Sequence, residues 1–305
     1  MLYSIEAGKI RTQGVEIAAA DHCNLRCAGC SHMSPFLGQR LAIEDELSRD
    51  LGRLATVMSA NEIRVVGGEP LLNPRIVAIL QAVRASGIAH RVVLATNGLL
   101  LPGMGREFWE NVDEVRINLY PRARPQERVL EKARSLAAES GTQLVISEYT
   151  DFRVTMVTEP HPADSLTRMI FRTCKNAHLY HCHMVHSGWL YKCACPRYLS
   201  EFLAKAGQSG YRPELDGFDI HAATDLRSEL WEFLTDNTVL DACRYCLGYV
   251  GKKQDHHQLA PADVLDPRSQ SISRSSHLDK FRLLGESMQY YYRRAAQVVS
   301  SRPKW

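Results

Sequence analysis

The sequence predicts an α/β fold whose strands form a parallel sheet, followed by a cysteine-rich extension. From residue 14 to about 148, short apolar runs alternate with amphipathic segments of about 10 to 16 residues, a pattern typical of βαβ units. The alternation stops near Tyr149, after too few repeats for an eight-stranded barrel. Beyond it, residues 150–260 are rich in His, Cys, Pro and Tyr and contain only short elements.

Each element follows from its own pattern. Apolar runs predict strands at 15–20, 63–66, 91–95, 112–120 and 142–147. Apolar residues at helical spacing predict helices at 45–60, 74–86, 125–140, 224–235 and 278–299. Pro74 suits the first position of its helix, where no N–H donor is needed, and Gly141 ends the helix that precedes it.

The length of 305 residues suits one or two domains. We expect a first domain over residues 1–149 and a cysteine-rich domain over 150–262. A tail over 263–305 would contain the last helix.

Charge and hydropathy exclude several classes of partner. The 37 Lys and Arg residues against 34 Asp and Glu give a formal charge of +3, too weak and too evenly spread for binding nucleic acid or a membrane surface. No stretch reaches about 18 apolar residues, as a transmembrane helix needs. The first residues lack the apolar run of a secretion signal, so we expect a cytoplasmic protein.

The nine cysteines are grouped rather than scattered. An odd count excludes complete pairing within the chain, and a reducing compartment disfavours disulfides. Such grouping is typical of thiolate ligands to a metal. The groups are Cys23, Cys27 and Cys30; Cys174, Cys182, Cys193 and Cys195; and Cys243 and Cys246.

The first group has the spacing C-x3-C-x2-C directly after the first predicted strand. Zinc sites usually draw four ligands from paired C-x2-C units. Three cysteines on one short loop instead suit three corners of a cubane 4Fe–4S cluster, with the fourth iron open to another ligand.

In this loop the sequence resembles the radical S-adenosylmethionine (radical SAM) superfamily. The resemblance implies a partial (β/α) TIM-like barrel and a 4Fe–4S cluster on Cys23, Cys27 and Cys30. The open iron would bind S-adenosylmethionine, whose reductive cleavage yields a 5′-deoxyadenosyl radical that takes hydrogen from a substrate carbon. The family often has an aromatic residue near the adenine just before the third cysteine. Gly29 stands there in this chain, so another side chain would have to pack the adenine.

Further motifs stand at the ends of the predicted strands, where barrel active sites are built. Gly67-Gly68-Glu69 matches the family's G-G-E segment, which binds the methionine amino group. Asn97 lies in a T-N-G turn, and Asn118 is a candidate for the ribose hydroxyls. Glu148 is a candidate for the adenosyl or substrate pocket. A tight turn for the glycines, an Asn-Gly turn for Asn97 and a solvated strand end for Asn118 are the structural alternatives.

The second group resembles the C-terminal SPASM and twitch extensions of some radical SAM enzymes. Cys174-x13-Gly188-x4-Cys193 matches their opening, a β-hairpin that precedes a cluster ligand, and Cys243-x2-Cys246 follows after a gap. The shorter twitch form implies one auxiliary 4Fe–4S cluster, here on Cys174, Cys193, Cys243 and Cys246.

Cys182 and Cys195 remain unassigned. On an extended segment Cys195 would share a face with Cys193 and could replace it as a ligand. Either thiol is a candidate hydrogen donor to a substrate radical, and a small buried hydrophobe is the structural alternative. Four histidines surround Cys182, namely His178, His181, His183 and His186. Together with the C-x2-C pair they could form a zinc site, which is the alternative to the auxiliary cluster. Otherwise they line a polar substrate pocket or pack at the surface.

We therefore expect a radical SAM enzyme that takes hydrogen from a C–H bond of a small polar molecule, giving epimerisation or dehydrogenation. The architecture resembles the 2-deoxy-scyllo-inosamine dehydrogenase and neomycin C epimerase type, which favours a carbohydrate or aminocyclitol substrate. An electron donor such as flavodoxin or ferredoxin is the expected partner. A peptide-modifying radical SAM enzyme and a non-catalytic iron–sulfur or zinc protein are the alternatives.

Overall fold

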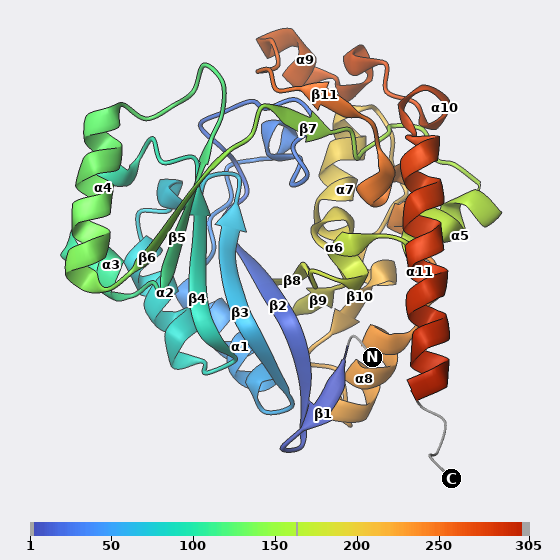
Figure 1. The fold of residues 1–305 in the computed structure, drawn as a ribbon, viewed down its shortest axis with the longest axis horizontal. Coiled ribbons are helices and arrows are strands. Elements are labelled where there is room, and N and C mark those ends of the chain that lie inside the picture. The colour runs from blue at the N-terminus through green and yellow to red at the C-terminus, as the bar shows by residue number, and fades with distance from the viewer. Residues whose placement is uncertain (1–2, 163, 301–305) are drawn as a thin grey trace.

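The computed structural model describes residues 3–162 and 164–300, without the side chains of 293–300. One central sheet runs in the order β10-β9-β8-β2-β3-β4-β5-β6, with β1 paired to β2 (Figure 1). Strands β2 to β6 are parallel, and β8 is parallel to β2. The bounds are β1 Ser4–Glu6, β2 Lys9–Ala20, β3 Met58–Gly67, β4 Ala89–Thr96, β5 Glu114–Leu119, β6 Gln143–Glu148, β8 His183–His186, β9 Trp189–Tyr191 and β10 Gly217–Asp219.

Helices cover one face of the parallel strands. Helices α1 to α4 pack there over the main apolar core, and the carboxyl ends of the strands point toward β7 and β11 at the top of Figure 1. The bounds are α1 Glu44–Ala55, α2 Ile76–Ala85, α3 Arg106–Glu110 and α4 Glu127–Ser140. Beyond them lie β7 Asp151–Arg153, α5 Ser165–Arg172, α6 Lys175–His178, α7 Ala194–Lys205, α8 Leu226–Thr235, β11 Lys253–Asp255, α9 Pro261–Leu265, α10 Arg274–His277 and α11 Lys280–Ser300.

The predicted α/β class and parallel sheet are confirmed, with corrections at element ends. The helix expected at 45–60 ends at Ala55, because Met58 is fully buried and already pairs with Ile10 as the first residue of β3. The helix expected from residue 74 begins at Ile76, since Pro74 lies in the preceding turn. Gly141 caps α4 in the left-handed conformation, as predicted.

The predicted division near residue 150 falls between β6 and β7. Three short strands from beyond it, β8, β9 and β10, nevertheless extend the same sheet next to β2. The expected C-terminal helix is α11. It packs against α5 and the 3-10 turn Gly248–Val250.

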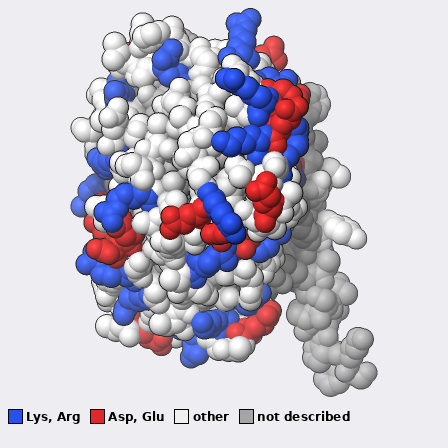
Figure 2. All heavy atoms as spheres, turned by 90° about the vertical axis from the view of Figure 1, so that its left-hand side faces the viewer, with Lys and Arg blue, Asp and Glu red and all other residues white. Residues whose placement is uncertain are grey.

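Charges of both signs are interspersed on the face turned to the viewer in Figure 2, in keeping with the small net charge. Ion pairs among surface charges include Arg84 with Asp113 and Arg134 with Glu127. No helix within the described ranges is long and apolar enough to cross a membrane.

Candidate functional site

The glycine pair after β3 lets the ends of β2 and β3 meet closely. Gly67 has a φ of +141°, and a Cβ at this position would lie 2.1 Å from the Ala20 carbonyl oxygen. A Cβ on Gly68 would lie 2.2 Å from the carbonyl oxygen of His22. The first cysteine loop therefore runs directly against the G-G-E turn, and no other residue type fits there.

Glu69 joins the ends of β3 and β4 and is completely buried. Its carboxylate accepts hydrogen bonds from Leu71 N (3.1 Å), the Thr96 hydroxyl (2.7 Å) and Asn97 N (2.9 Å). Burial raises the pKa of Glu69 to about 7 despite these donors. Since a carboxylate offers about four acceptor positions, one remains for a ligand ammonium group.

Asn97 reaches from the T-N-G turn to the cysteine loop. Its amide nitrogen donates to Asn24 Oδ1 (2.7 Å) and lies 3.9 Å from Cys23 Sγ. Leu25 N donates to the same sulfur at 3.4 Å. The structure thus brings the predicted Asn97 and Cys23 together.

A segment from the far end of the chain closes over the loop. The backbone of Cys27 forms an antiparallel bridge with Gln258, and Leu259 N donates to the Arg26 carbonyl (2.7 Å). Gln258 Nε2 donates to Cys27 Sγ (3.3 Å), and His256 Nε2 lies 3.1 Å from this sulfur. No local pattern predicts these contacts, because about 230 residues separate the partners along the chain.

These features coincide with one known family. Residues 17–120 match the Radical SAM superfamily. This stretch is a radical SAM domain. It runs from within β2 to Tyr120 and includes the cysteine loop, Glu69 and Asn97. The predicted partial barrel of radical SAM type is therefore confirmed.

Curated relatives match about a third of this chain. This chain is 37% identical over 102 residues to a GTP 3′,8-cyclase from Geobacter sulfurreducens, covering 32% of this chain and 30% of that one. A GTP 3′,8-cyclase from Nostoc punctiforme is 31% identical over 109 residues, covering 34% and 33%. The chain thus spans about a third of the length of these relatives.

Two solved structures are similar over longer stretches. The crystal structure of BtrN in complex with AdoMet and 2-DOIA is 15% identical, covers 78% of this chain and 94% of that one, and has a TM-score of 0.46. Native anSMEcpe with bound AdoMet and a Cp18Cys peptide is 13% identical, covers 95% and 99%, and has a TM-score of 0.45. At these scores, neither similarity extends to substrate or mechanism.

The three thiols of the radical SAM domain fit the cluster that this family carries. Burial, with a smaller contribution from neighbouring Cys30, raises the pKa of Cys23 to about 12 and that of Cys27 to about 11. Thiolates this close repel one another, so a positively charged iron cluster would favour their joint ionisation. No three His, Cys, Asp or Glu side chains of the described part surround a single point as one metal ion requires. A cubane spreads its ligands over separate iron corners.

Five cysteines from the second and third groups surround a small cavity of about 30 Å³. Its lining is otherwise apolar, with Ile170, Phe171 and Leu240 among the neighbours. Burial raises the pKa of Cys174, Cys193 and Cys243. The hydrogen bond between Cys195 and Cys246, together with burial, raises the pKa of Cys195, and the same hydrogen bond lowers that of Cys246. The lining cysteines are Cys174, Cys193, Cys195, Cys243 and Cys246.

Cys195 lines this cavity for a different reason than the sequence suggested. The expected extended segment is wrong, because α7 begins at Ala194 and places Cys195 in its first turn. Pro196 is tolerated there since the first N–H groups of a helix have no partner within it. The Cys195 sulfur lies 3.7 Å from Met156 Sδ.

Cys182 stands apart from the cavity, on the sheet face opposite α1 to α4. Its thiol accepts a hydrogen bond from Arg64 Nη1 (3.3 Å), which also pairs with Glu16 at 2.7 Å. Burial and the Glu16 carboxylate raise the pKa of Cys182, and Arg64 opposes them. The thiol therefore keeps its proton at neutral pH.

A ladder of ion pairs crosses this inner face of the sheet. The charged residues of this ladder alternate with buried apolar residues along β2 to β5. This alternation is a sequence signal from which a charged inner face could have been predicted. Arg116 is one-third exposed, and its guanidinium lies 3.0 Å from the Glu62 carboxylate. The full set is Glu16, Glu62, Arg64, Arg91, Glu114 and Arg116.

The two remaining predicted site residues, Asn118 and Glu148, lie in different surroundings. Asn118 lies beside Tyr120 and hydrogen-bonds its side chain, near the cysteine loop. Glu148 ends β6 as an exposed residue paired with Arg124 at 2.6 Å, apart from the network around Glu69.

The histidines near Cys182 act as packing residues. His183 is fully buried and uses both ring nitrogens, toward the Tyr3 hydroxyl (2.9 Å) and the Lys192 carbonyl (3.0 Å). His181 hydrogen-bonds Thr12 at 2.7 Å. Burial lowers the pKa of His178, His181 and His186, so all three stay neutral.

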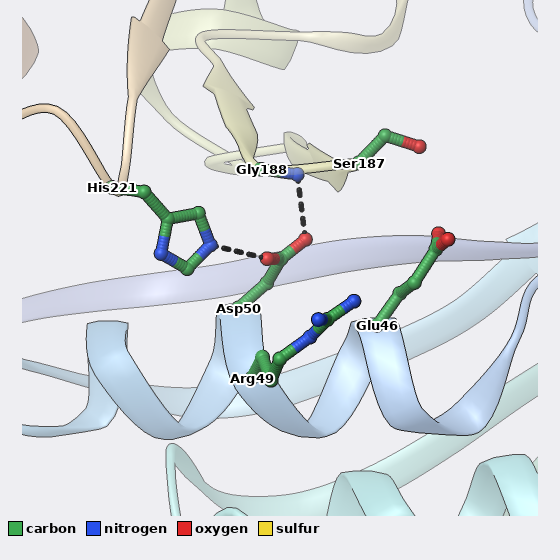
Figure 3. A pocket seen from close by; sticks show the side chains of 6 residues that line it. All are labelled: Glu46, Arg49, Asp50, Ser187, Gly188 and His221. Carbon is green, nitrogen blue, oxygen red and sulfur yellow. Dashed lines mark hydrogen bonds and ion pairs between the residues drawn. The ribbon is translucent and has the colours of Figure 1, made fainter.

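A separate cavity of about 410 Å³ lies on the helix side, between α1 and the β8–β9 turn (Figure 3). Buried Asp50 accepts a hydrogen bond from Gly188 N and pairs with His221 Nε2, both at 2.7 Å. Gly188 has a φ of +82°, which explains the glycine of the predicted hairpin. Asp50 thus ties the barrel to the hairpin that leads to Cys193.

Proposed function

We propose that this chain is a radical SAM enzyme acting on a small polar molecule, with a second, auxiliary 4Fe–4S cluster. One observation carries the proposal. The three-cysteine loop converges with the ends of β3, β4 and β5 through Glu69, Asn97 and Asn118.

Each of these residues has a defined task in the proposal. Cys23, Cys27 and Cys30 hold the catalytic cluster, and the turn at Gly67-Gly68-Glu69 receives the amino group of S-adenosylmethionine. When bound, the cluster and this cofactor supply a 5′-deoxyadenosyl radical by one-electron cleavage. Asn97 keeps the cysteine loop against β4.

The auxiliary cluster belongs to the five-cysteine cavity. Cys174, Cys193, Cys243 and Cys246 are the proposed ligands, and Cys195 lies beside them through its hydrogen bond to Cys246. An enclosed apolar site protects such a cluster from solvent.

The charged inner face of the sheet supports a polar substrate, and we favour a carbohydrate or an aminocyclitol. A substrate radical next to oxygen or nitrogen has two outcomes here. It would lose a proton, and an electron to the proposed auxiliary cluster, giving dehydrogenation. Alternatively, it would take a hydrogen atom from the protonated Cys182 thiol, giving epimerisation, and an electron from the external donor with a proton from solvent would restore the resulting thiyl radical to the thiol. GTP is a competing substrate class, because the curated relatives that match about a third of this chain are GTP 3′,8-cyclases. Peptides are another.

Anaerobic reconstitution followed by product analysis tests the proposal. We expect about eight irons per chain, and 5′-deoxyadenosine formation that one class in a panel of aminoglycosides, sugars, GTP and peptides stimulates. About four irons together with zinc would contradict the auxiliary cluster. A fully loaded, reduced protein that forms no 5′-deoxyadenosine would favour a non-catalytic protein.

A further inference from the structure

The pair of strands β7 and β11 fills the space beside Gly29, just before the third cysteine. Gly29 has a φ of +74°, and a Cβ there would lie 3.1 Å from Gln254 Nε2 and 3.5 Å from Phe152 Cβ. Phe152 and Gln254 face each other across the two strands. Side chains from β7 and β11 therefore occupy the space that a larger side chain at position 29 would fill.

Three aromatic rings meet at this place. The His256 ring stacks on Tyr120, with centroids 5.0 Å apart and an angle of 15° between the rings. The Phe152 ring stands edge-on to both, at 5.4 Å from Tyr120 and 5.1 Å from His256. Since the sulfur of Cys27 lies 3.1 Å from His256, this aromatic group borders the cysteine loop.

Two buried polar atoms of the same strand region lack partners among the described residues. They are Gln254 Nε2 and His256 Nδ1. His256 Nε2 lies near the Cys27 sulfur (3.1 Å) and Gln258 Nε2 (3.4 Å), whereas Nδ1 of the same ring has no partner. Gln254 therefore presents a free amide donor two residues before this free ring nitrogen, which is an acceptor when Nε2 carries the ring proton.

We propose that β7 and β11 bind the adenine of S-adenosylmethionine, with Phe152 as the apolar contact and Gln254 and His256 as the hydrogen-bonding edge. Adenine displays the matching pattern, an amino group at N6 beside a ring-nitrogen acceptor. Gln254 is only partly buried, and the proposal requires its side chain to turn outward as the base enters. The inference rests on the proposed function and assigns the cofactor contact that Gly29 does not supply.

Equilibrium dialysis of the reconstituted, iron-loaded protein tests this assignment with S-adenosylhomocysteine and S-inosylhomocysteine. Hypoxanthine carries an acceptor in place of the N6 amino group, so we expect the adenine ligand to bind about tenfold more tightly. Gln254→Leu should reduce that preference, and Phe152→Leu should weaken both ligands about tenfold. Gln143→Leu at the start of β6 and Phe281→Leu, whose ring is 90% exposed on α11, are matched controls that should change neither value.

The outcomes separate this inference from the proposed function. Equal affinities for the two ligands in the parent protein, or variants that bind like their controls, would overturn the adenine site alone. A loaded protein that binds neither S-adenosylhomocysteine nor S-adenosylmethionine would overturn the proposed function. Should Phe152→Leu lose iron, Phe152→Tyr decides, because it keeps the ring and must keep the affinity.

Discussion

The two cysteine groups differ in their surroundings more than in their number. Cys23, Cys27 and Cys30 lie on a loop whose neighbours are amides, an imidazole and a buried carboxylate. The other set, Cys174, Cys193, Cys195, Cys243 and Cys246, lines an apolar cavity of about 30 Å³. Three thiols in polar surroundings suit a cluster that exchanges ligands, whereas an enclosed apolar site suits a fully ligated cluster that only passes electrons.

Removing one ligand from each group gives the largest expected effects. Cys27→Ala should remove about four irons and abolish 5′-deoxyadenosine formation, because an incomplete set of three thiolates cannot hold the catalytic cluster. Cys243→Ala should also remove about four irons but leave S-adenosylmethionine binding intact. Iron analysis measures the cluster content of both variants, and equilibrium dialysis measures their S-adenosylmethionine binding.

If Cys243→Ala also abolished cofactor binding, the two groups would not be independent. Cys182→Ala serves as the matched control, because Cys182 lies outside both the three-cysteine loop and the five-cysteine cavity and the variant should leave the iron content unchanged.

The two cysteines outside the ligand sets provide the next comparison. In D₂O the Cys182 thiol exchanges its proton, so an epimerised product should carry solvent deuterium at carbon. Cys182→Ala should lower this incorporation at least about a hundredfold, a typical loss for a proton- or hydrogen-transferring group, while Cys195→Ala keeps it. Mass spectrometry of the product measures the label. Unchanged incorporation in Cys182→Ala would exclude that thiol as the donor.

Removing the contact between Asp50 and the β8–β9 hairpin should have a smaller effect, and this effect is on stability. Asp50→Ala leaves the Gly188 N–H without its acceptor and should lower the free energy of unfolding by about 2 kcal/mol. Arg49→Ala, which changes an exposed side chain on the lining of the same cavity, should cost less than about 0.5 kcal/mol. Urea denaturation compares them, and equal costs would show that Asp50 does not hold the hairpin.

The sequence predicted what local spacing can encode. The cysteine loop, the G-G-E turn and the hairpin glycine each need particular residues within a few positions, and they were found. The pairing of His256 and Gln258 with Cys27 was not, because nothing in a sequence marks contacts across about 230 residues. The start of β3 was placed too late, since the helical spacing of α1 continues beyond the point where Met58 joins the sheet.

The smallest expected effect concerns Glu69, the buried carboxylate beside the three-cysteine loop, whose titration should make the free energy of unfolding depend on pH. Burial raises its pKa from 4.5 to about 7, so the folded protein binds a proton more tightly than the unfolded chain between these values. The free energy of unfolding should therefore fall as the pH rises from about 4.5 to about 7. Glu69→Gln removes the titrating group and should flatten this dependence, even if it shifts the absolute stability. Urea denaturation at pH 5 and pH 7.5 gives both slopes, and parallel slopes for the two proteins would mean that Glu69 is ionised throughout.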